Sequence, residues 1–328
     1  MSHLHKITVI IPTYKRPKTL NKTLKVLSKQ YPKPYQVIVV DNSSNQEASL
    51  IVSLFKNTLP IEYYVAKKRG PSYARNIGYE HARGEIIALL DDDCVPTNNW
   101  CKEIINTYKT NAYAHVVFQE KCQHIFPNTN FMTEMFYFRN TRYKTTGFRE
   151  DKFRVIDGVH AGCCFMNRSV LYTLRYLFDT ELFPFIGEEY DFSIRAQLAG
   201  CIFLEHNKVS VTHYKQPLRR IDKSFHNAFM IGRCLGITQY KYPVASKVIK
   251  LFSKEKNSIQ KKEFFAIMTN YSLFLRRFKQ KSVFWKISAF LYEVLRSTII
   301  YFGYIYGSVW YVYYAKRFKN TSPLSTFQ

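Results

Sequence analysis

Apolar runs alternate with amphipathic segments in the first part of the chain. The runs predict buried strands over residues 7–12, 36–40, 61–65 and 85–90. Between them, apolar residues recur at helical spacing and predict helices that begin near Thr19, Glu47 and Gly70. Strands that alternate with helices in this way are typical of a doubly wound, mostly parallel α/β sheet.

The regular pattern weakens from residue 100 to residue 143, where aromatic residues are dense. Over 158–166 a run of small residues leads into a short apolar strand, and a helix that ends at Gly200 and a last strand over 209–213 follow. Beyond about Arg220 the chain changes to basic, amphipathic helices. We therefore expect an α/β domain over 1–220 and a basic, aromatic-rich helical extension over 221–328.

Three consecutive carboxylates, Asp91, Asp92 and Asp93, follow the apolar run 86–90. An unpaired carboxylate is costly to bury, so the strand must emerge at Asp91, at the sheet edge where ligands bind in open α/β folds. Asp91 and Asp93 point to one side of an extended strand end, which suits a hard cation such as Mg²⁺ or Mn²⁺. A plain acidic turn is the alternative. Asp41 ends the run 36–40 and falls at the same edge.

Charge is unevenly distributed over the 328 residues. The formal net charge is +24, and the part from Lys215 onward holds 21 Lys and Arg against 4 Asp and Glu. A basic half indicates an anionic partner: nucleic acid, an anionic membrane face or a phosphate-bearing substrate. The seven cysteines form no CxxC pair, and the N-terminal residues show no signal peptide, so we expect a reducing cytosol.

Five separated motifs then occur in an order that resembles the family 2 glycosyltransferases. They are Pro12-Thr13-Tyr14, Asp41-Asn42-Ser43, Gly70-Pro71-x-x-Ala74-Arg75-Asn76-x-Gly78, Leu90-Asp91-x-Asp93, and Gly187-Glu188-Glu189-x-Asp191-x-x-x-Arg195, with His213 after them. The match covers residues 7 to about 214. The resemblance implies a GT-A fold, with a donor half at about 1–98 and an acceptor half at about 99–220.

The resemblance also implies an activity. It is that of an inverting, hexosyltransferase-like enzyme that moves a sugar from a UDP-, GDP- or dTDP-linked donor to a glycan or lipid-linked acceptor, with a divalent metal, Mn²⁺ or Mg²⁺. Cell-surface polysaccharide biosynthesis is the expected setting. Two positions depart from the pattern of many relatives: Glu188-Glu189 stands where they have Glu-Asp, and Cys94 stands where they often have a further Asp.

The motifs assign residues to the donor and the metal by this resemblance. Donor-binding residues are Pro12, Thr13, Tyr14, Arg16, Asp41, Arg75, Asp91 and Asp92, and metal ligands are Asp93 and His213. Three alternatives stay open: Asp41 as an N-cap of the next helix, Arg75 in an ion pair with an acid such as Asp91, and His213 as a surface histidine.

The acidic cluster Glu188, Glu189 and Asp191 supplies the expected catalytic residues. The acceptor hydroxyl must lose a proton as it attacks, so a base must stand nearby. Three acids this close raise one another's pKa, which suits a base that works near neutral pH. Glu189 is the first choice, Asp191 the second, with Glu188 orienting the base. A charged first helical turn is the alternative, and Arg195 suits an ion pair with the cluster as well as a phosphate contact.

The C-terminal part contains amphipathic segments over 261–281 and 283–296, then an uncharged, tyrosine-rich segment over 297–315. The tyrosine rings and the flanking basic residues favour docking in the plane of an anionic membrane surface. The alternatives are packing against the catalytic domain or a second subunit, and a helix that spans the membrane. We therefore expect a cytoplasmic protein attached peripherally to the inner face of the plasma membrane.

Two competing functions follow from the same features. A nucleic-acid-binding protein would use the basic half, but no known nucleic-acid motif is visible and the aligned acids would repel phosphate unless a metal intervened. The second competing function is that of a catalytically inactive, membrane-bound partner of another transferase. The intact set of acids argues against it. We expect no nucleic-acid partner.

Overall fold

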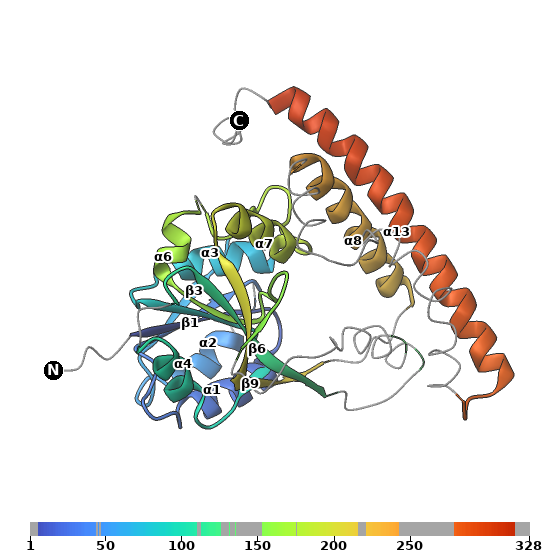
Figure 1. Ribbon diagram of the computed structural model, residues 1–328. Coiled ribbons are helices and arrows are strands. Elements are labelled where there is room, and N and C mark those ends of the chain that lie inside the picture. Colours follow the sequence, from blue (N-terminus) through green and yellow to red (C-terminus); the bar gives the residue numbers. More distant parts are fainter. Residues whose placement is uncertain are drawn as a thin grey trace. The chain divides into compact units, whose positions relative to one another are not determined.

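The computed structural model describes residues 6–43, 45, 47–109, 113–125, 131, 135, 153–174, 176–215, 221–242 and 279–318 (Figure 1). The chain forms two compact units. The first comprises residues 1–127 and 145–216, and the second comprises residues 128–144 and 217–328. The acids and histidines singled out in the sequence all belong to the first unit.

One mixed sheet forms the first unit. Its described strands are β1 (Ile7–Thr13), β2 (Gln36–Asp41), β3 (Ile61–Val65), β4 (Ile86–Leu90), β5 (Cys94–Pro96), β6 (Val116–Ile125), β7 (Phe153–Val155), β8 (Cys163–Asn167) and β9 (Ile202–Tyr214). They lie in the order β3-β2-β1-β4-β8-β6-β9-β5, and β7 pairs with β9. The strands β3, β2, β1 and β4 are parallel, β8 is antiparallel to its neighbours, and β6 and β9 are parallel.

Helices cover both faces of this sheet, as the alternating pattern predicted (Figure 1). One core cluster joins alternate residues of the strands to α1 (Pro17–Leu27), α2 (Glu47–Ser53) and α4 (Trp100–Thr107). The opposite cluster joins the intervening strand residues to α3 (Pro71–Glu80), α6 (Arg168–Tyr172) and α7 (Glu188–Leu198). Central strands buried on both faces explain why β1, β2 and β4 read as unbroken apolar runs.

Several boundaries differ from the sequence-based expectation. Helix α1 begins at Pro17 with Arg16 as its N-cap, not at Thr19, because proline is well suited to the first helical position. The strands β5 and β6 and the helix α4 fall in or beside the segment whose pattern was weak. Strand β9 extends over 202–214 and so begins before residue 209.

A bulge divides the long β6–β9 pair. Glu120 lies opposite His206, but the next residue of β6, Lys121, lies opposite Ser210. Three residues of β9 are therefore inserted, and the His206 ring accepts the N–H groups of Lys208 and Val209 at 3.1 and 3.0 Å. An inserted odd number of residues changes which face of the sheet the following side chains occupy.

The second unit contains α8 (Ile221–Lys241) and α13 (Val283–Phe318). Their backbones approach closely: a Cβ added at Gly232 or Gly236 would lie 1.9 or 2.2 Å from a carbonyl oxygen of α13, and one at Gly303 or Gly307 would lie 2.2 or 2.1 Å from one of α8. Only glycine permits such packing. The two C-terminal segments predicted over 283–296 and 297–315 form this single helix, and the predicted helix over 261–281 lies almost wholly outside the described residues.

Candidate active site

The carboxyl ends of β2 and β4 bring the predicted acids to one edge of the sheet. Both strands are parallel to β1, which lies between them. Asp41 is the last residue of β2, and Asp91 follows β4 directly. The β1 end lies at the same edge, with Pro12 buried and paired to Val40, and Tyr14 just beyond it, 37% exposed.

Asp92 and Asp93 are held by groups that follow β1. Thr13 Oγ1 donates to Asp92 at 2.6 Å, and Arg16 Nη1 lies 3.1 Å from Asp92 and 2.8 Å from Asp93 Oδ2. Burial raises the pKa of Asp92 to about 7, against the lowering effect of Arg16. Asp92 is only 2% exposed, so its contacts anchor Arg16 and Thr13 beside the site.

Asp93 and His213, which the sequence predicted as metal ligands, lie next to each other. His213 Nε2 lies 2.9 Å from Asp93 Oδ1, and the Tyr214 N–H donates to the Asp93 carbonyl at 2.9 Å, which ties β9 to the acidic segment. Burial acts to lower the pKa of His213, but its contacts with Asp93 and Cys122 raise it to about 9. His213 is 5% exposed, so the alternative of a surface histidine is wrong.

The residues fit a divalent cation. Asp93 Oδ1 is buried and, apart from His213 Nε2 at 2.9 Å, has no polar partner in the described part of the chain. A carboxylate oxygen and an imidazole nitrogen that converge in this way offer two ligands to one ion. The geometry is therefore that of a candidate site for the expected Mn²⁺ or Mg²⁺.

Asp41 accepts three hydrogen bonds from neighbouring groups. Its Oδ1 accepts the N–H and hydroxyl of Ser43 at 2.7 and 2.6 Å, and its Oδ2 accepts the Tyr63 hydroxyl at 2.9 Å. Burial and this hydrogen bond raise the pKa of Tyr63. The N-cap alternative is wrong, because α2 begins only at Glu47. Asp41 instead fixes the turn after β2, and a donor contact remains a prediction.

Arg75 joins the acidic triplet to the acids of α7. Its Nη2 lies 2.7 Å from Asp91, and its Nη1 lies 3.1 Å from Glu188. The ion pair with Asp91, an alternative left open by the sequence, is therefore present. Burial acts to raise the pKa of Asp91, but Arg75 holds it below its ordinary value. Arg75 is 4% exposed, so it would reach a donor only by giving up one of these partners.

The acids of α7 differ in their surroundings. Asp191 is fully buried, and its Oδ2 accepts Arg195 Nε at 2.8 Å, so the ion pair expected as one possibility is present. Glu188 is buried beside Arg75, and burial raises its pKa to about 7. The Glu189 side chain is 28% exposed. Burial is therefore the main cause of the raised pKa of Glu188, whereas the sequence led us to expect repulsion between neighbouring acids.

The loop over 160–162 connects Glu189 to Asp91. Glu189 Oε2 lies 3.4 Å from His160 Nδ1 and accepts the Ala161 N–H at 3.4 Å. The next residue, Gly162, accepts the Asp91 N–H at 2.8 Å, and a Cβ on Gly162 would lie 2.2 Å from Asp91 Oδ2. One short loop, residues 160–162, therefore contacts both Glu189 and Asp91.

Sequence reasoning missed several residues of this site. Gly162 was seen only as part of a run of small residues, and its role appears only when Asp91 is placed against it. Asn42 accepts the Gly70 N–H at 2.6 Å and so holds the turn before α3, where Gly70 has φ 138°. Cys122 and His124 lie in a strand that the sequence did not predict.

The sheet order, the acidic edge and the Asp93–His213 pair together define a GT-A type of nucleotide-diphospho-sugar transferase fold. The sequence profile described as glycosyl transferase family 2 matches residues 8–175, about half of the chain. The chain belongs to glycosyl transferase family 2, and the family resemblance noted in the sequence is confirmed.

Similar curated proteins are transferases from bacteria and archaea. An uncharacterized glycosyltransferase of Rickettsia felis is 27% identical over 195 residues, covering 56% of this chain and 28% of that protein. The GalNAc(5)-diNAcBac-PP-undecaprenol beta-1,3-glucosyltransferase of Campylobacter jejuni is 37% identical over 91 residues, covering 27% and 29%. The chain thus spans less than a third of the length of each of these two relatives.

Solved structures share the fold. The mannosyltransferase PcManGT of Pyrobaculum calidifontis, in complex with GDP-Man and Mn²⁺, has a TM-score of 0.59 at 16% identity, covering 94% of this chain and 88% of that one. GalNAc-T7 with UDP, GalNAc and Mn²⁺ has a TM-score of 0.55 at 17% identity, covering 90% and 58%. The predicted GT-A fold class is confirmed.

Proposed function

We propose that the protein is an inverting glycosyltransferase that moves a sugar from a nucleotide-sugar donor to a hydroxyl of a glycan or lipid-linked acceptor. One observation carries the proposal: the loop over 160–162 and Arg75 tie the acidic triplet, with its Asp93–His213 pair, to a partly exposed carboxylate, Glu189. A cation site and a candidate base side by side are the two parts that such a transfer requires.

Asp93 and His213 would hold the metal, with Arg16 placed beside Asp93 as an additional positive charge. The bound Mn²⁺ or Mg²⁺ would neutralise the negative charge that develops on the leaving diphosphate. Arg16 has 42% of its side chain exposed, so it can move toward a diphosphate while Thr13 keeps its hydrogen bond to Asp92. Asp41 would accept hydrogen bonds from the base or ribose of the donor, and Asp91 would contact the ribose or the outer shell of the metal.

Glu189 is the proposed general base. It takes the proton of the acceptor hydroxyl at a carboxylate oxygen as that hydroxyl attacks the anomeric carbon. Arg75 and Glu188 position the chain around it, because their ion pair connects the start of α7 to Asp91. Asp191 is fully buried and accepts a hydrogen bond from Arg195 within α7, so an acceptor cannot reach it. A single displacement of this kind inverts the anomeric centre.

The donor class and the acceptor class come from similar proteins. Solved neighbours are described with GDP-Man and with UDP, and the relative from Campylobacter jejuni is named for an undecaprenol-linked acceptor. A UDP-, GDP- or dTDP-linked donor and a lipid-linked acceptor of cell-surface polysaccharide biosynthesis are therefore the proposed substrates.

We further propose that residues 221–328 attach a catalytic domain over 1–220 to the inner face of the plasma membrane. No helix among the described residues is long and apolar enough to cross a bilayer. Along α13, large apolar residues recur three, four or seven positions apart and are exposed: Phe284, Ile287, Leu291, Leu295, Phe302, Ile305, Val309 and Val312. An exposed apolar stripe in a basic segment suits in-plane docking on anionic lipid.

A donor screen tests the function. Purified protein with Mn²⁺ is incubated with UDP-, GDP- and dTDP-sugars, and release of the nucleoside diphosphate is measured with and without lipid-linked acceptors. The proposal expects hydrolysis of one donor class, abolished by chelation and changed little by moderate salt. If no donor is turned over and nucleic acid is bound with a steep salt dependence, the nucleic-acid alternative replaces it. If neither occurs, the inactive-partner alternative holds.

A further inference from the structure

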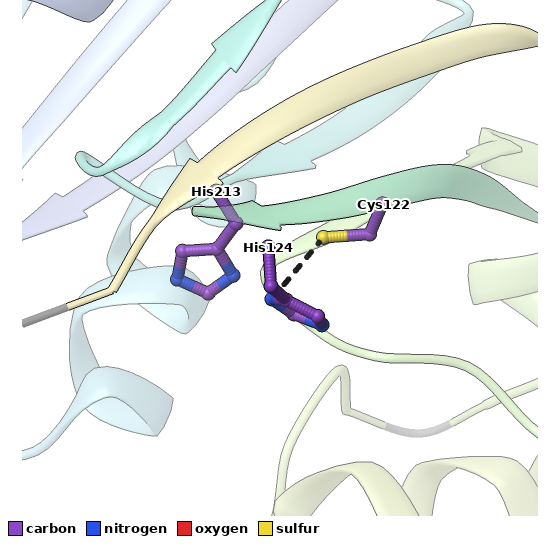
Figure 2. A group of neighbouring side chains, drawn as sticks. All are labelled: Cys122, His124 and His213. Atoms are coloured by element: carbon purple, nitrogen blue, oxygen red, sulfur yellow. Dashed lines mark hydrogen bonds between the residues drawn. The ribbon is translucent and has the colours of Figure 1, made fainter. Parts of the chain in front are cut away.

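Cys122 and His124 lie next to His213 and have no part in the proposed transfer. One ligand atom from each of the three side chains lies within 4.8 Å of the others. Cys122 Sγ and His124 Nδ1 are 3.8 Å apart, and the rings of His124 and His213 have centroids 5.3 Å apart at 45°. Figure 2 shows the thiol and both rings gathered where β6 and β9 run side by side.

The backbone accounts for this grouping. Cys122 and His124 are two positions apart on β6 and therefore share one face of the sheet. The bulge in β9 sets His213 directly opposite His124. Without the three inserted residues, the register before the bulge would place Ser210 opposite His124 and leave His213 outside the group. The bulge thus builds the cluster, whereas the Asp93–His213 pair follows from the pairing of β5 with β9.

We propose that Cys122, His124 and His213 form a binding site for a divalent transition-metal ion of borderline softness, with Zn²⁺ as the expected occupant. Thiolate and imidazole are preferred zinc ligands, whereas Mg²⁺ and Mn²⁺ prefer oxygen. Zinc–sulfur and zinc–nitrogen bond lengths place tetrahedral S and N ligands about 3.5 Å apart. The 3.8 Å between Cys122 and His124 is close to that value.

Binding of the metal ion releases the thiol proton of Cys122. Cys122 releases its thiol proton to solvent and binds as the thiolate, and both imidazoles bind in their neutral form. Three protein ligands leave a fourth position for water or an anion, as in zinc sites that stay open. Cys122 and His124 are partly exposed, so an ion can reach them from solvent.

His213 belongs to this site and also to the pair with Asp93. A neutral imidazole has one lone pair for a metal, so His213 serves one ion at a time. An ion on Cys122 and His124 therefore withdraws His213 from Asp93, and Zn²⁺ is expected to oppose Mn²⁺ or Mg²⁺ in the transfer. This last consequence rests on the proposed function, whereas the binding itself does not.

The test uses Co²⁺ as a spectroscopic substitute for Zn²⁺ in the full chain. Cobalt bound by a thiolate shows a charge-transfer absorption in the near ultraviolet, which cobalt bound only by oxygen and nitrogen lacks. We expect this band in the wild type and its loss when Zn²⁺ is added. Cys122→Ser should abolish the band, and His124→Gln should weaken Co²⁺ binding about tenfold or more.

Matched controls separate this site from the others. Cys201→Ser and His115→Gln change a thiol and an imidazole elsewhere in the first unit and should leave the band unchanged. Asp93→Asn should keep the band, since Asp93 belongs to the other pair. Circular dichroism checks that each variant is folded.

Three results would overturn the proposal. They are the absence of the band in the folded wild type, a band that survives in Cys122→Ser, and Co²⁺ affinity unchanged in His124→Gln. None of them depends on turnover. Failure of the donor screen with the band present would leave the metal site standing and remove only the expected competition between Zn²⁺ and Mn²⁺.

Discussion

Asp93 and His213 face each other at 2.9 Å although 120 positions separate them along the chain, because β9 returns to pair with β5 immediately after the acidic triplet. Asp93→Ala should abolish metal-dependent transfer, since it removes the carboxylate that we propose as a ligand of the cation. The protein should stay folded, because Arg16 keeps its second partner, Asp92.

Turnover at saturating Mn²⁺ and the melting temperature check this. Asp157→Ala, which removes an exposed aspartate from the same unit, is the control and should behave as wild type. Near wild-type turnover of folded Asp93→Ala would show that the metal assignment is wrong.

Arg75 carries a stability prediction. Arg75→Ala leaves Asp91 and Glu188 without their shared cation, and breaking a buried ion pair costs about 3–5 kcal/mol. The melting temperature should fall clearly, whereas Arg83→Ala, which removes an exposed ion pair with Glu62, should change it little.

The loss should depend on pH. The pKa of Glu188 is already about 7 and rises further without Arg75, because Arg75 lowers it. A carboxyl whose pKa is raised in the folded state stabilises that state as pH falls through this pKa. The Arg75→Ala defect should therefore be smaller at about pH 5.5 than at about pH 8. An equal defect at both would mean that Glu188 stays ionised.

The strands that end in acids could be predicted from sequence because each is buried on both faces and reads as an apolar run. The site could be predicted only in part. Asp93 and His213 come together because β9 pairs with the short strand β5, which the sequence did not predict. The shift of three residues between Glu120 and Lys121, which places His213 opposite His124, leaves no mark in the hydrophobic pattern. The role of Arg75 depends on Asp91 and Glu188, which are distant in sequence, so an ion pair and a donor contact looked alike.

Gly162 lies against Asp91, and this contact gives a third prediction. In Gly162→Ala, a Cβ would lie 2.2 Å from Asp91 Oδ2, so the carboxylate must move. A displacement of about 1 Å in a catalytic group can cost about 10²-fold, and we expect kcat/KM to fall by roughly that factor. Gly158→Ala is the control, because its Cβ would lie 2.7 Å from Ser193 Oγ and so crowd the loop away from Asp91. It should lower kcat/KM only a few-fold. Equal losses in the two variants would point to general disorder of the loop.

The exposed stripe of α13 gives a fourth prediction, made in the full chain. Replacing Phe284, Ile287 and Leu291 together by Ser should reduce co-sedimentation with anionic vesicles at least tenfold, because each buried apolar side chain contributes about 1.5–3 kcal/mol. Leu50→Ser with Leu54→Ser removes equally exposed apolar residues from the first unit and should leave binding unchanged. Binding unaffected by the triple change, or equal on neutral vesicles, would argue against docking of α13 on anionic lipid.

Glu189 and Asp191 differ in exposure, and this difference separates their expected roles. An inverting transfer needs a base only for the acceptor's proton, so Glu189→Gln should lower kcat by about 10²- to 10⁴-fold. Donor affinity should stay nearly unchanged, because the residues proposed to hold the donor, Asp41, Arg75 and Asp91, and the metal ligands are intact. No covalent sugar–enzyme intermediate should accumulate.

Asp191→Asn should act differently. It removes the charge opposite the buried Arg195, so the melting temperature should fall while kcat per folded molecule changes less than in Glu189→Gln. Glu181→Gln, at an exposed glutamate, is the control for loss of one charge. A large loss of kcat in folded Asp191→Asn with a small one in Glu189→Gln would assign the base to the shorter acid. If neither substitution lowers kcat more than a few-fold, the base lies elsewhere. His160, 3.4 Å from Glu189, is then the next residue to change.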